Sequence, residues 1–261
     1  MPQMYYEVVG DLATGVPLVL LHGMFASRRM WDPNRDALAE RFALVLVDLP
    51  GHGTSPPMKS DAEALPAALV AGLENIRKEL DIPRWCLCGQ SFGAGVTLQY
   101  TLAHPERVAA QAFTNSRTTF RDAYGAAETE VREGRIKRIR AGGREEMQRE
   151  VFHPRHAKRF PEAIKAVLSQ EADEIDIETY LRLIALSSPA LSLYGRAAEP
   201  KVPTLLINGR HERAFQACRS EIAEAWPQME IIDIDGGHAV NIENPNGFDA
   251  ALTGFLERHL G

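Results

Sequence analysis

Apolar runs bounded by turn-forming residues recur along the chain, and stretches with helical spacing separate them. The runs are continuous rather than alternating, which is typical of strands in a parallel sheet covered on both faces. They lie at residues 16–21, 43–47, 84–88, 108–114, 203–207 and 229–234. The helical stretches lie around residues 30–41, 64–80, 93–103 and 245–259. This alternation predicts a mostly parallel, doubly wound α/β sheet that binds ligands at the carboxyl ends of its strands.

One segment, residues 119–199, breaks the alternation because it contains no convincing strand. Its apolar residues follow helical spacing, and a helical insert between two core strands predicts a cap over the strand ends. The chain is then divided into an α/β core, residues 1–118 and 200–261, and a helical cap, residues 119–199. We interpret the basic run of this cap as a solvated helix face. The run contains Arg132, Arg135, Lys137, Arg138 and Arg140.

The segment Gly89-Gln90-Ser91-Phe92-Gly93 lies between a predicted strand and a predicted helix. A Gly-x-Ser-x-Gly motif in that place is typical of a nucleophile elbow, a sharp turn that holds its serine in a strained conformation above the sheet. The two glycines leave room where a Cβ would clash. Because glycine and serine are common in loops, the motif needs support from a base, an acid and an oxyanion hole.

His238 is the candidate base for Ser91. It lies in Asp235-Gly236-Gly237-His238, directly after the last predicted strand, where a loop histidine reaches the strand ends. A structural histidine is the alternative, and the position after a strand and two glycines favours the base.

Glu212 is the candidate acid, because it follows the strand at 203–207 and precedes His238 in the chain order Ser, acid, His. Its alternative is a surface glutamate paired with Arg210 or Arg213. Asp233 and Asp235 are less favourable acids, since they lie in or beside the strand that leads to His238. We expect His211 to be a neighbour of the site.

Backbone amides form an oxyanion hole, so side-chain identity indicates them poorly. The residue after the nucleophile, Phe92, supplies one expected N–H. The second is expected from Met24, after the tight turn at His22-Gly23. The glycine-punctuated segment from Asp48 to Ser55 matches no phosphate-binding motif, so we interpret it as a structural turn.

Composition excludes several classes of function. The chain has 261 residues, 45% of them hydrophobic and 25% charged, with a net charge of −6. This charge argues against nucleic acid or an anionic membrane as partner, and no stretch approaches the roughly 20 apolar residues of a membrane span. The N-terminus lacks a signal-peptide pattern, which favours the cytoplasm. Cys86 and Cys88 are expected to be buried free thiols on one face of a strand. No metal-ligand spacing is evident, and His153 and His156 are expected on the surface.

Five motifs together make the chain resemble the α/β-hydrolase superfamily, in particular its capped esterases, lactonases and carbon–carbon bond hydrolases. The resemblance extends from about Val16 to Leu260. The motifs are Leu21-His22-Gly23, Asp48 through Ser55, Gly89 through Gly93, Ala103-His104-Pro105-Glu106-Arg107-Val108, and Gly237-His238 followed by Glu243-Asn244-Pro245.

The resemblance implies Ser91 as nucleophile, His238 as base, the Phe92 and Met24 amides as oxyanion hole, and a helical cap between core strands six and seven. Many members of the superfamily have aspartate where this chain has Glu212, whose side chain is longer by one methylene group. The serine at the elbow argues against the dehalogenase and epoxide hydrolase branches, which have aspartate there.

We therefore expect a cofactor-free serine hydrolase that cleaves a small carboxylic ester. A lactone, a thioester or a carbon–carbon bond is an alternative substrate for the same triad. A small-molecule receptor or interaction protein with little turnover is the alternative of another class. Arg28, Arg29 and Arg117 follow loops near the expected site, and they are candidates for holding a substrate carboxylate.

Overall fold

The computed structural model describes residues 2–195 and 199–260. Within these residues seven strands form one sheet, in the order β1-β3-β2-β4-β5-β6-β7, and only β1 is antiparallel to its neighbour. The strands are β1 Tyr6–Val9, β2 Val16–Leu21, β3 Phe42–Val47, β4 Trp85–Gly89, β5 Val108–Thr114, β6 Thr204–Gly209 and β7 Glu230–Ile234. The six predicted strands are confirmed as β2 to β7, and β1 is an additional strand at the edge.

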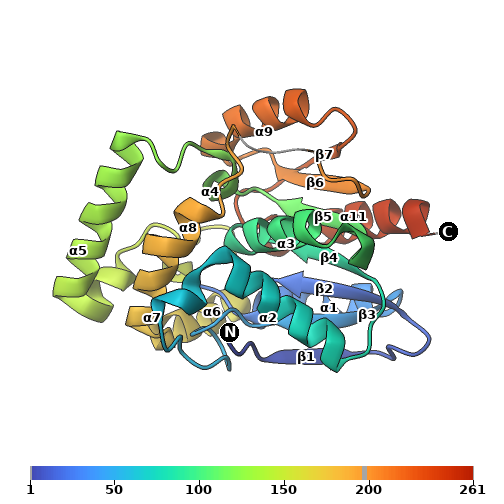
Figure 1. Cartoon of the computed structure of the whole chain (residues 1–261), viewed down its shortest axis with the longest axis horizontal. Helices are drawn as coiled ribbons and strands as arrows, with labels where there is room; N and C mark the ends of the chain where they lie inside the picture. The colour runs from blue at the N-terminus through green and yellow to red at the C-terminus, as the bar shows by residue number, and fades with distance from the viewer. Residues whose placement is uncertain (1, 196–198, 261) are drawn as a thin grey trace.

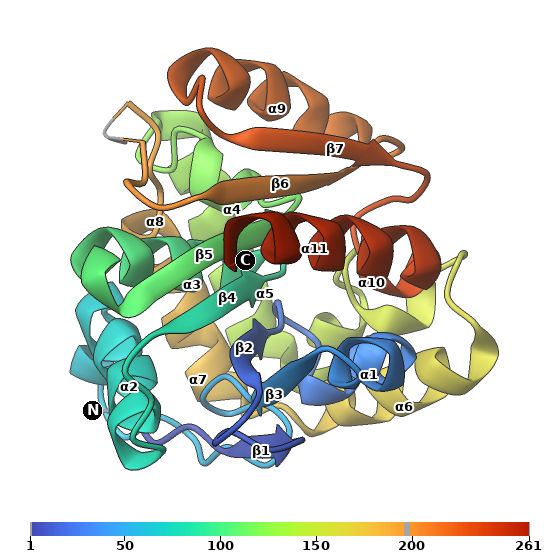
Figure 2. The same ribbon diagram turned by 90° about the vertical axis from the view of Figure 1, so that its right-hand side faces the viewer.

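Helices cover both faces of the sheet, as its continuous apolar strands require. Figures 1 and 2 show α2 and α3 on one face and α1 and α11 on the other. The core helices are α1 Asp32–Ala39, α2 Pro66–Glu79, α3 Phe92–Ala103, α9 Arg213–Ala225, α10 Val240–Glu243 and α11 Pro245–Leu260. The fold is therefore the expected doubly wound α/β sheet.

Cys86 and Cys88 on β4 are buried free thiols on one face of the strand, as expected. Both thiols are free and fully buried, and both belong to the apolar cluster on the α1 and α11 side, whereas Leu87 packs on the opposite side. Burial raises the pKa of the Cys86 thiol to about 12 and raises that of Cys88 further. Neither thiol ionises readily, so both residues act as small apolar side chains.

A helical insert lies between β5 and β6. Its helices are α4 Arg117–Phe120, α5 Ala126–Gln148, α6 Glu162–Glu174, α7 Ile177–Arg182 and α8 Ser188–Ala190, with a π-helix at Leu183–Ser187 between the last two. The first of these helices begins two residues before the expected segment 119–199, of which residues 196–198 lie outside the described residues. The insert was expected between core strands six and seven, a numbering that requires two strands before the run at residues 16–21. Within the described residues only β1 precedes that run, so the insert lies between the fifth and sixth strands.

The insert contacts the core loops that follow β2 and β3. The Thr179 hydroxyl accepts from the Met58 amide at 2.9 Å, and a Cβ on Gly51 (φ 70°) would lie 2.6 Å from the Thr179 methyl group. Phe25, in the loop after β2, belongs to the apolar core of the insert, with its ring centroid 4.8 Å from that of Tyr180. The insert is thus packed onto the loops at the carboxyl ends of β2 and β3.

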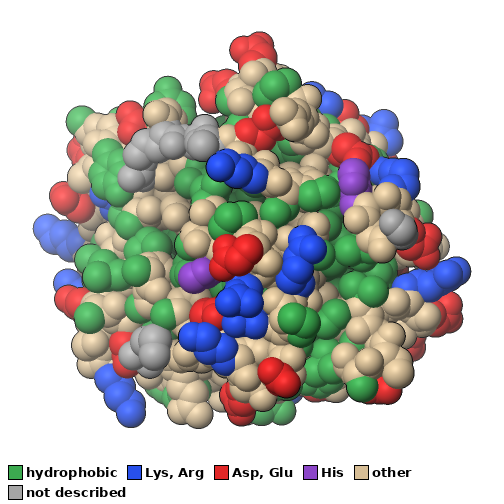
Figure 3. Space-filling view, turned by 45° about the vertical axis from the view of Figure 1, so that its right-hand side comes forward, with side chains coloured by type: hydrophobic (Ala, Val, Ile, Leu, Met, Phe, Trp, Pro, Cys, Tyr) green, Lys and Arg blue, Asp and Glu red, His purple; other side chains and the backbone are tan. Residues whose placement is uncertain are grey.

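The outer surface mixes charges of both signs. Figure 3 shows acidic, basic and apolar side chains interspersed over one face. None of the described helices is long and apolar enough to cross a membrane.

Candidate active site

Ser91 lies on the sharp turn between β4 and α3. Its backbone has φ 51° and ψ −113°, a conformation that is costly for a residue with a Cβ. A Cβ on Gly89 would lie 2.5 Å from the Gly93 carbonyl oxygen, and one on Gly93 would lie 2.5 Å from the His22 carbonyl oxygen. The two glycines therefore permit the close backbone packing that holds the turn.

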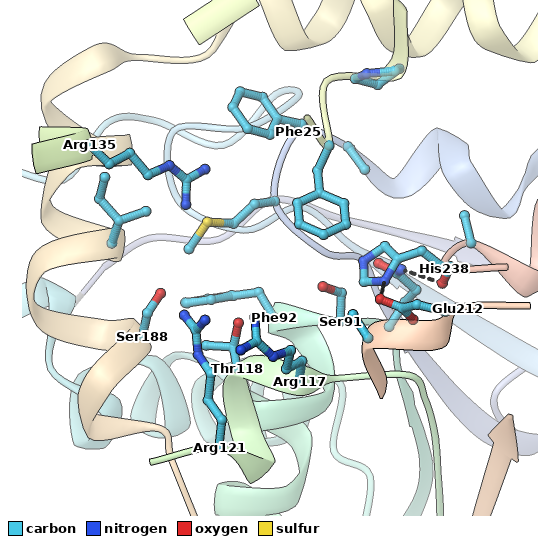
Figure 4. Close-up of a pocket in the computed structure, with 18 of the residues that line it drawn as sticks. Phe25, Ser91, Phe92, Arg117, Thr118, Arg121, Arg135, Ser188, Glu212 and His238 are labelled. Carbon is cyan, nitrogen blue, oxygen red and sulfur yellow. Dashed lines mark hydrogen bonds and ion pairs between the residues drawn. The ribbon is translucent and has the colours of Figure 1, made fainter. Parts of the chain in front are cut away.

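His238 and Glu212 come from loops after β7 and β6, and the structure brings them together. The distance from Nδ1 of His238 to Oε1 of Glu212 is 2.8 Å. Glu212 is largely buried, with 11% of its side chain exposed, and its Oε2 has no hydrogen-bond partner within the described part of the chain. Because Nδ1 contacts the Glu212 carboxylate, Nε2 is the ring nitrogen of His238 that remains available to accept or donate a proton in the cavity. Figure 4 shows Ser91 beside His238.

The loop that carries His238 is fixed by contacts that sequence reasoning missed. The side-chain amide of Gln90, inside the elbow motif, donates to the His238 carbonyl oxygen at 3.2 Å. The Gly237 amide donates to Glu243 at 2.8 Å. The ring of Phe152, from the insert, lies 4.7 Å from the His238 ring, centroid to centroid. These contacts orient the imidazole from the elbow side and from the insert side.

The alternative acids do not contact His238. Asp235 is exposed and accepts a hydrogen bond from His211 at 2.6 Å, with Arg210 at 3.8 Å. Asp233 forms an ion pair with Arg219.

The loop after β2 places Met24 at the cavity, and His22 holds that loop. The buried His22 ring bonds the Gly23 carbonyl through Nδ1 at 2.7 Å and accepts from the Leu49 amide at Nε2 at 2.9 Å. Burial lowers the pKa of His22, so the ring is neutral and structural. The backbone N–H groups of Met24 and Phe92 have no hydrogen-bond acceptor among the described residues. Both are therefore free to donate to a ligand.

The segment that begins at Asp48 is a structural turn, as expected. The Asp48 carboxylate accepts from the Arg28 amide at 2.7 Å, from the Arg28 guanidinium at 2.7 Å and from the Thr54 amide at 3.0 Å. Arg28 also pairs with Glu7 at 3.1 Å.

A buried polar network anchors α10, the helix that follows His238. The Asn34 amide donates to Asp249 at 2.8 Å and to the Asn241 carbonyl at 3.1 Å, and Asn241 donates to Met30 at 3.0 Å. Burial raises the pKa of Asp249 to about 6, against the opposing effect of the Asn34 hydrogen bond. A carboxyl whose pKa is raised on folding stabilises the native state at low pH, and that contribution is lost as the pH rises through about 6.

Replacing the Asp249 carboxyl with a neutral amide should remove the loss of native-state stability that accompanies ionisation of Asp249 as the pH rises. We expect the Tm of Asp249→Asn, relative to the unsubstituted chain, to increase between pH 4.5 and pH 7.5, because only the unsubstituted chain must ionise a half-buried group. Thermal unfolding by circular dichroism at the two pH values measures this. A difference in Tm that stays constant or shrinks over this range would contradict the expectation.

Ser91, Phe92, Met24, Glu212 and His238 all line one cavity of about 260 Å³ between the sheet and the insert. Its walls are otherwise largely apolar, and they include residues of both parts of the chain. Among them are Phe25, Arg117, Arg121, Arg132, Arg135, Phe152 and Ile184.

Of the three arginines expected near a substrate, only Arg117 lines the cavity. Arg28 does not, because Asp48 and Glu7 hold its guanidinium. Arg29 is exposed and pairs with Asp32 at 3.1 Å. Neither is placed to hold a substrate carboxylate in this cavity.

The interpretation of the basic run as a solvated face is wrong for Arg132 and Arg135, which line the cavity, and correct for Lys137, Arg138 and Arg140, which are exposed. Sequence reasoning also missed Arg121. A signal was present, because Arg132 and Arg135 share a helix face with the buried Ile139 at offsets of seven and four residues.

The expectation for the histidine pair in the insert is wrong for one member. His153 is buried and contacts Asp173 at 3.2 Å, whereas His156 is exposed as expected. Among the described residues no group of three or more His, Cys, Asp or Glu side chains is arranged to hold a metal ion.

Comparisons with known proteins agree with this architecture. The 1-acylglycerol-3-phosphate O-acyltransferase of Arabidopsis thaliana is 29% identical over 94% of this chain and 68% of that protein. The pimeloyl-[acyl-carrier protein] methyl ester esterase of Nitrosospira multiformis is 27% identical over 89% of this chain and 88% of that protein.

Solved structures share the fold. MenH from S. aureus superposes with a TM-score of 0.85 at 21% identity over all of both chains. The enol-lactonase from Burkholderia xenovorans superposes with a TM-score of 0.77 at 24% identity, over 97% of this chain and 96% of that one. The family model described as alpha/beta hydrolase fold matches residues 16–245. The chain therefore belongs to the α/β-hydrolase family.

Proposed function

We propose that the protein is a serine hydrolase that cleaves small carboxylic esters through an acyl-enzyme, without a cofactor. The observation that carries the proposal is the arrangement at the cavity. Ser91 stands on a strained turn beside His238, whose Nδ1 lies 2.8 Å from Glu212. A nucleophile, a base and a group that orients the base are the parts that acyl transfer requires.

Acylation begins when Nε2 of His238 takes the proton of the Ser91 hydroxyl. Oγ of Ser91 then attacks the ester carbonyl carbon, and the carbonyl oxygen becomes an oxyanion that accepts from the Phe92 and Met24 amides. Glu212 stabilises the imidazolium and holds the proton on Nδ1. Collapse of the intermediate expels the alcohol, which takes the proton from Nε2.

Deacylation follows the same path with water as nucleophile. His238 takes a proton from water, the hydroxide attacks the acyl carbon, and the oxyanion is held by the same two amides. When the intermediate collapses, Oγ of Ser91 regains its proton from Nε2 and the carboxylic acid leaves.

The insert is proposed to act as a lid, with residues 119–199 as cap and the rest of the chain as core. Supporting this division, Arg132, Phe152 and Ile184 of the insert line the same cavity as Ser91. A cavity of about 260 Å³ suits a small-molecule substrate. Three free, buried cysteines are in keeping with the expected cytoplasmic location.

The names of two relatives support acyl chemistry. One is an O-acyltransferase and the other a methyl ester esterase. Both names describe transfer or hydrolysis at an acyl group that is linked through oxygen, which is the reaction that the arrangement at Ser91 suits.

A fluorophosphonate probe tests the proposal, because it forms a covalent bond only with a serine activated by its surroundings. We expect the probe to modify Ser91 alone, as mapped by peptide mass spectrometry, and p-nitrophenyl butyrate to be hydrolysed. Folded protein that neither reacts with the probe nor hydrolyses the ester would favour a small-molecule receptor. Faster hydrolysis of lactones or thioesters than of esters would indicate that the same three residues cleave a lactone or thioester bond instead.

A further inference from the structure

Four arginine side chains gather along one part of the cavity. Arg117 begins α4, Arg121 follows it, and Arg132 and Arg135 come from α5. Figure 4 shows Arg121 and Arg135 on the left of the cavity, Glu212 and His238 on the right, and Arg117 between Arg121 and Ser91. The chain as a whole has a net charge of −6, so this gathering of positive charge is a local feature.

The acidic residues nearby do not neutralise the four guanidinium groups. Glu128 is shared, with Arg117 at 3.0 Å and Arg121 at 2.8 Å. Arg135 pairs with Glu150 at 2.6 Å. Within the part of the chain that the structure describes, two carboxylates pair with these guanidinium groups, which leaves two of the four positive charges without a carboxylate partner.

Arg132 has no carboxylate partner among the described residues. Its guanidinium donates to the Ala123 carbonyl oxygen at 2.8 Å and to the Thr129 hydroxyl at 3.2 Å. These neutral acceptors hold the side chain in place and leave its charge uncompensated. An anion in the cavity would find a fixed positive group there.

The arginines are close enough to repel one another. Burial lowers the pKa of Arg121, Glu128 opposes this effect, and the positive charges of Arg117, Arg135 and Arg132 lower the pKa further. Holding like charges close together in a partly buried site is unfavourable. A bound anion would offset that cost, and the planar guanidinium groups match the oxygens of a carboxylate or phosphate.

Resting on the function proposed above, we propose that the substrate carries an anionic oxygen group, a carboxylate or a phosphate, remote from the bond that Ser91 attacks. Arg117, Arg121, Arg132 and Arg135 receive that group, and Glu128 keeps the first two in position. The ester carbonyl is then directed toward Ser91, at the other part of the cavity.

Matched esters test this preference. The mono-p-nitrophenyl ester of glutaric acid and p-nitrophenyl valerate have acyl chains of equal length and differ in the terminal carboxylate. We expect kcat/KM to be about 10- to 100-fold higher for the glutarate ester, chiefly through a lower KM, since hydrogen bonds to charged groups have strengths of that order. The mono-p-nitrophenyl ester of 4-phosphonobutyric acid decides between carboxylate and phosphate as the preferred group.

Variants place the effect on the arginines. Arg132→Gln and Arg117→Gln should each reduce the ratio of acidic-ester to neutral-ester kcat/KM by about 10-fold or more. Arg138→Gln is the matched control on α5, because Arg138 is exposed and does not line the cavity, and it should leave the ratio unchanged. Thermal unfolding of each variant separates a binding effect from loss of the fold.

A binding experiment keeps the test independent of turnover. Glutarate and propylphosphonate titrated into the unsubstituted protein at low salt should release or absorb heat, and Arg132→Gln should weaken that binding. The proposal is overturned if neither anion binds, or if the neutral ester is preferred and the ratio is the same in Arg132→Gln. Anion binding without hydrolysis of any ester would uphold the arginine site and count against the hydrolase.

Discussion

Replacing Ser91 with alanine is expected to lower kcat/KM for p-nitrophenyl butyrate by at least about 10⁴-fold. The Ser91 hydroxyl beside His238 is the proposed nucleophile, and alanine has no atom that can form the proposed acyl-enzyme. Folding should be little affected, because serine and alanine meet the same backbone cost at φ 51°. Steady-state hydrolysis and fluorophosphonate labelling measure the loss, with thermal unfolding as the check on the fold.

Ser188 provides a matched control for this substitution. It is another serine that lines the cavity, on α8 of the insert, and nothing places it beside His238. Ser188→Ala should therefore keep kcat/KM within about fivefold, the range of surface and lining substitutions that touch no reacting atom. Comparable losses in both variants, or activity that survives Ser91→Ala, would mean that Ser91 is not the nucleophile.

Replacing Glu212 with glutamine should lower kcat by about 10³- to 10⁴-fold. The side chain keeps its size, but the negative charge that would stabilise the imidazolium is lost. The new amide can also donate toward Nδ1 of His238, which moves the ring proton to Nε2 and so blocks proton removal from Ser91. Pre-steady-state release of p-nitrophenol should be slower in Glu212→Gln than in the unsubstituted protein, which reports slower acylation. After long incubation, the fluorophosphonate probe should still modify as much Ser91 as in the unsubstituted protein.

Asp235→Asn is the control for the acid. Asp235 is exposed and contacts His211 and Arg210 instead of His238, so we expect kcat within about twofold of the unsubstituted value. If Asp235→Asn removed activity and Glu212→Gln did not, the acid would be Asp235 and the contact between Glu212 and His238 would be structural only.

Most of the sheet could be predicted because β2, β3 and β4 are continuous apolar runs and β5 and β6 are largely apolar, although β7 contains Glu230 and Asp233. The edge strand Tyr6–Val9 is short and only half-buried, so its pattern does not stand out. A short edge strand of this kind is defined by the strand it pairs with, which local pattern does not show. The helix Arg213–Ala225 is absent from the expected elements although its buried residues Phe215, Cys218 and Ile222 follow helical spacing, so its pattern was available in the sequence.

The meeting of Ser91, His238 and Glu212 could be predicted because each follows a strand, and the carboxyl ends of parallel strands share one edge of the sheet. For the arginines the sequence offers only the helix face that Arg132 and Arg135 share with Ile139, and it does not show what that face packs on. Arg132 and Arg138 have the same chemistry and lie on the same helix, and only the position of α5 over the sheet places one in the cavity and the other in solvent.

The ring of Phe25 has a consequence for redesign. It is buried in the apolar core of the insert, and its neighbour Met24 lines the cavity with Ser91. A chimera that exchanges the insert for that of another protein of the fold would leave this ring without its pocket and remove one of the contacts that hold the loop carrying Met24. An exchange of the insert that is meant to change substrate specificity therefore has to include residue 25, because its side chain belongs to the core of the insert.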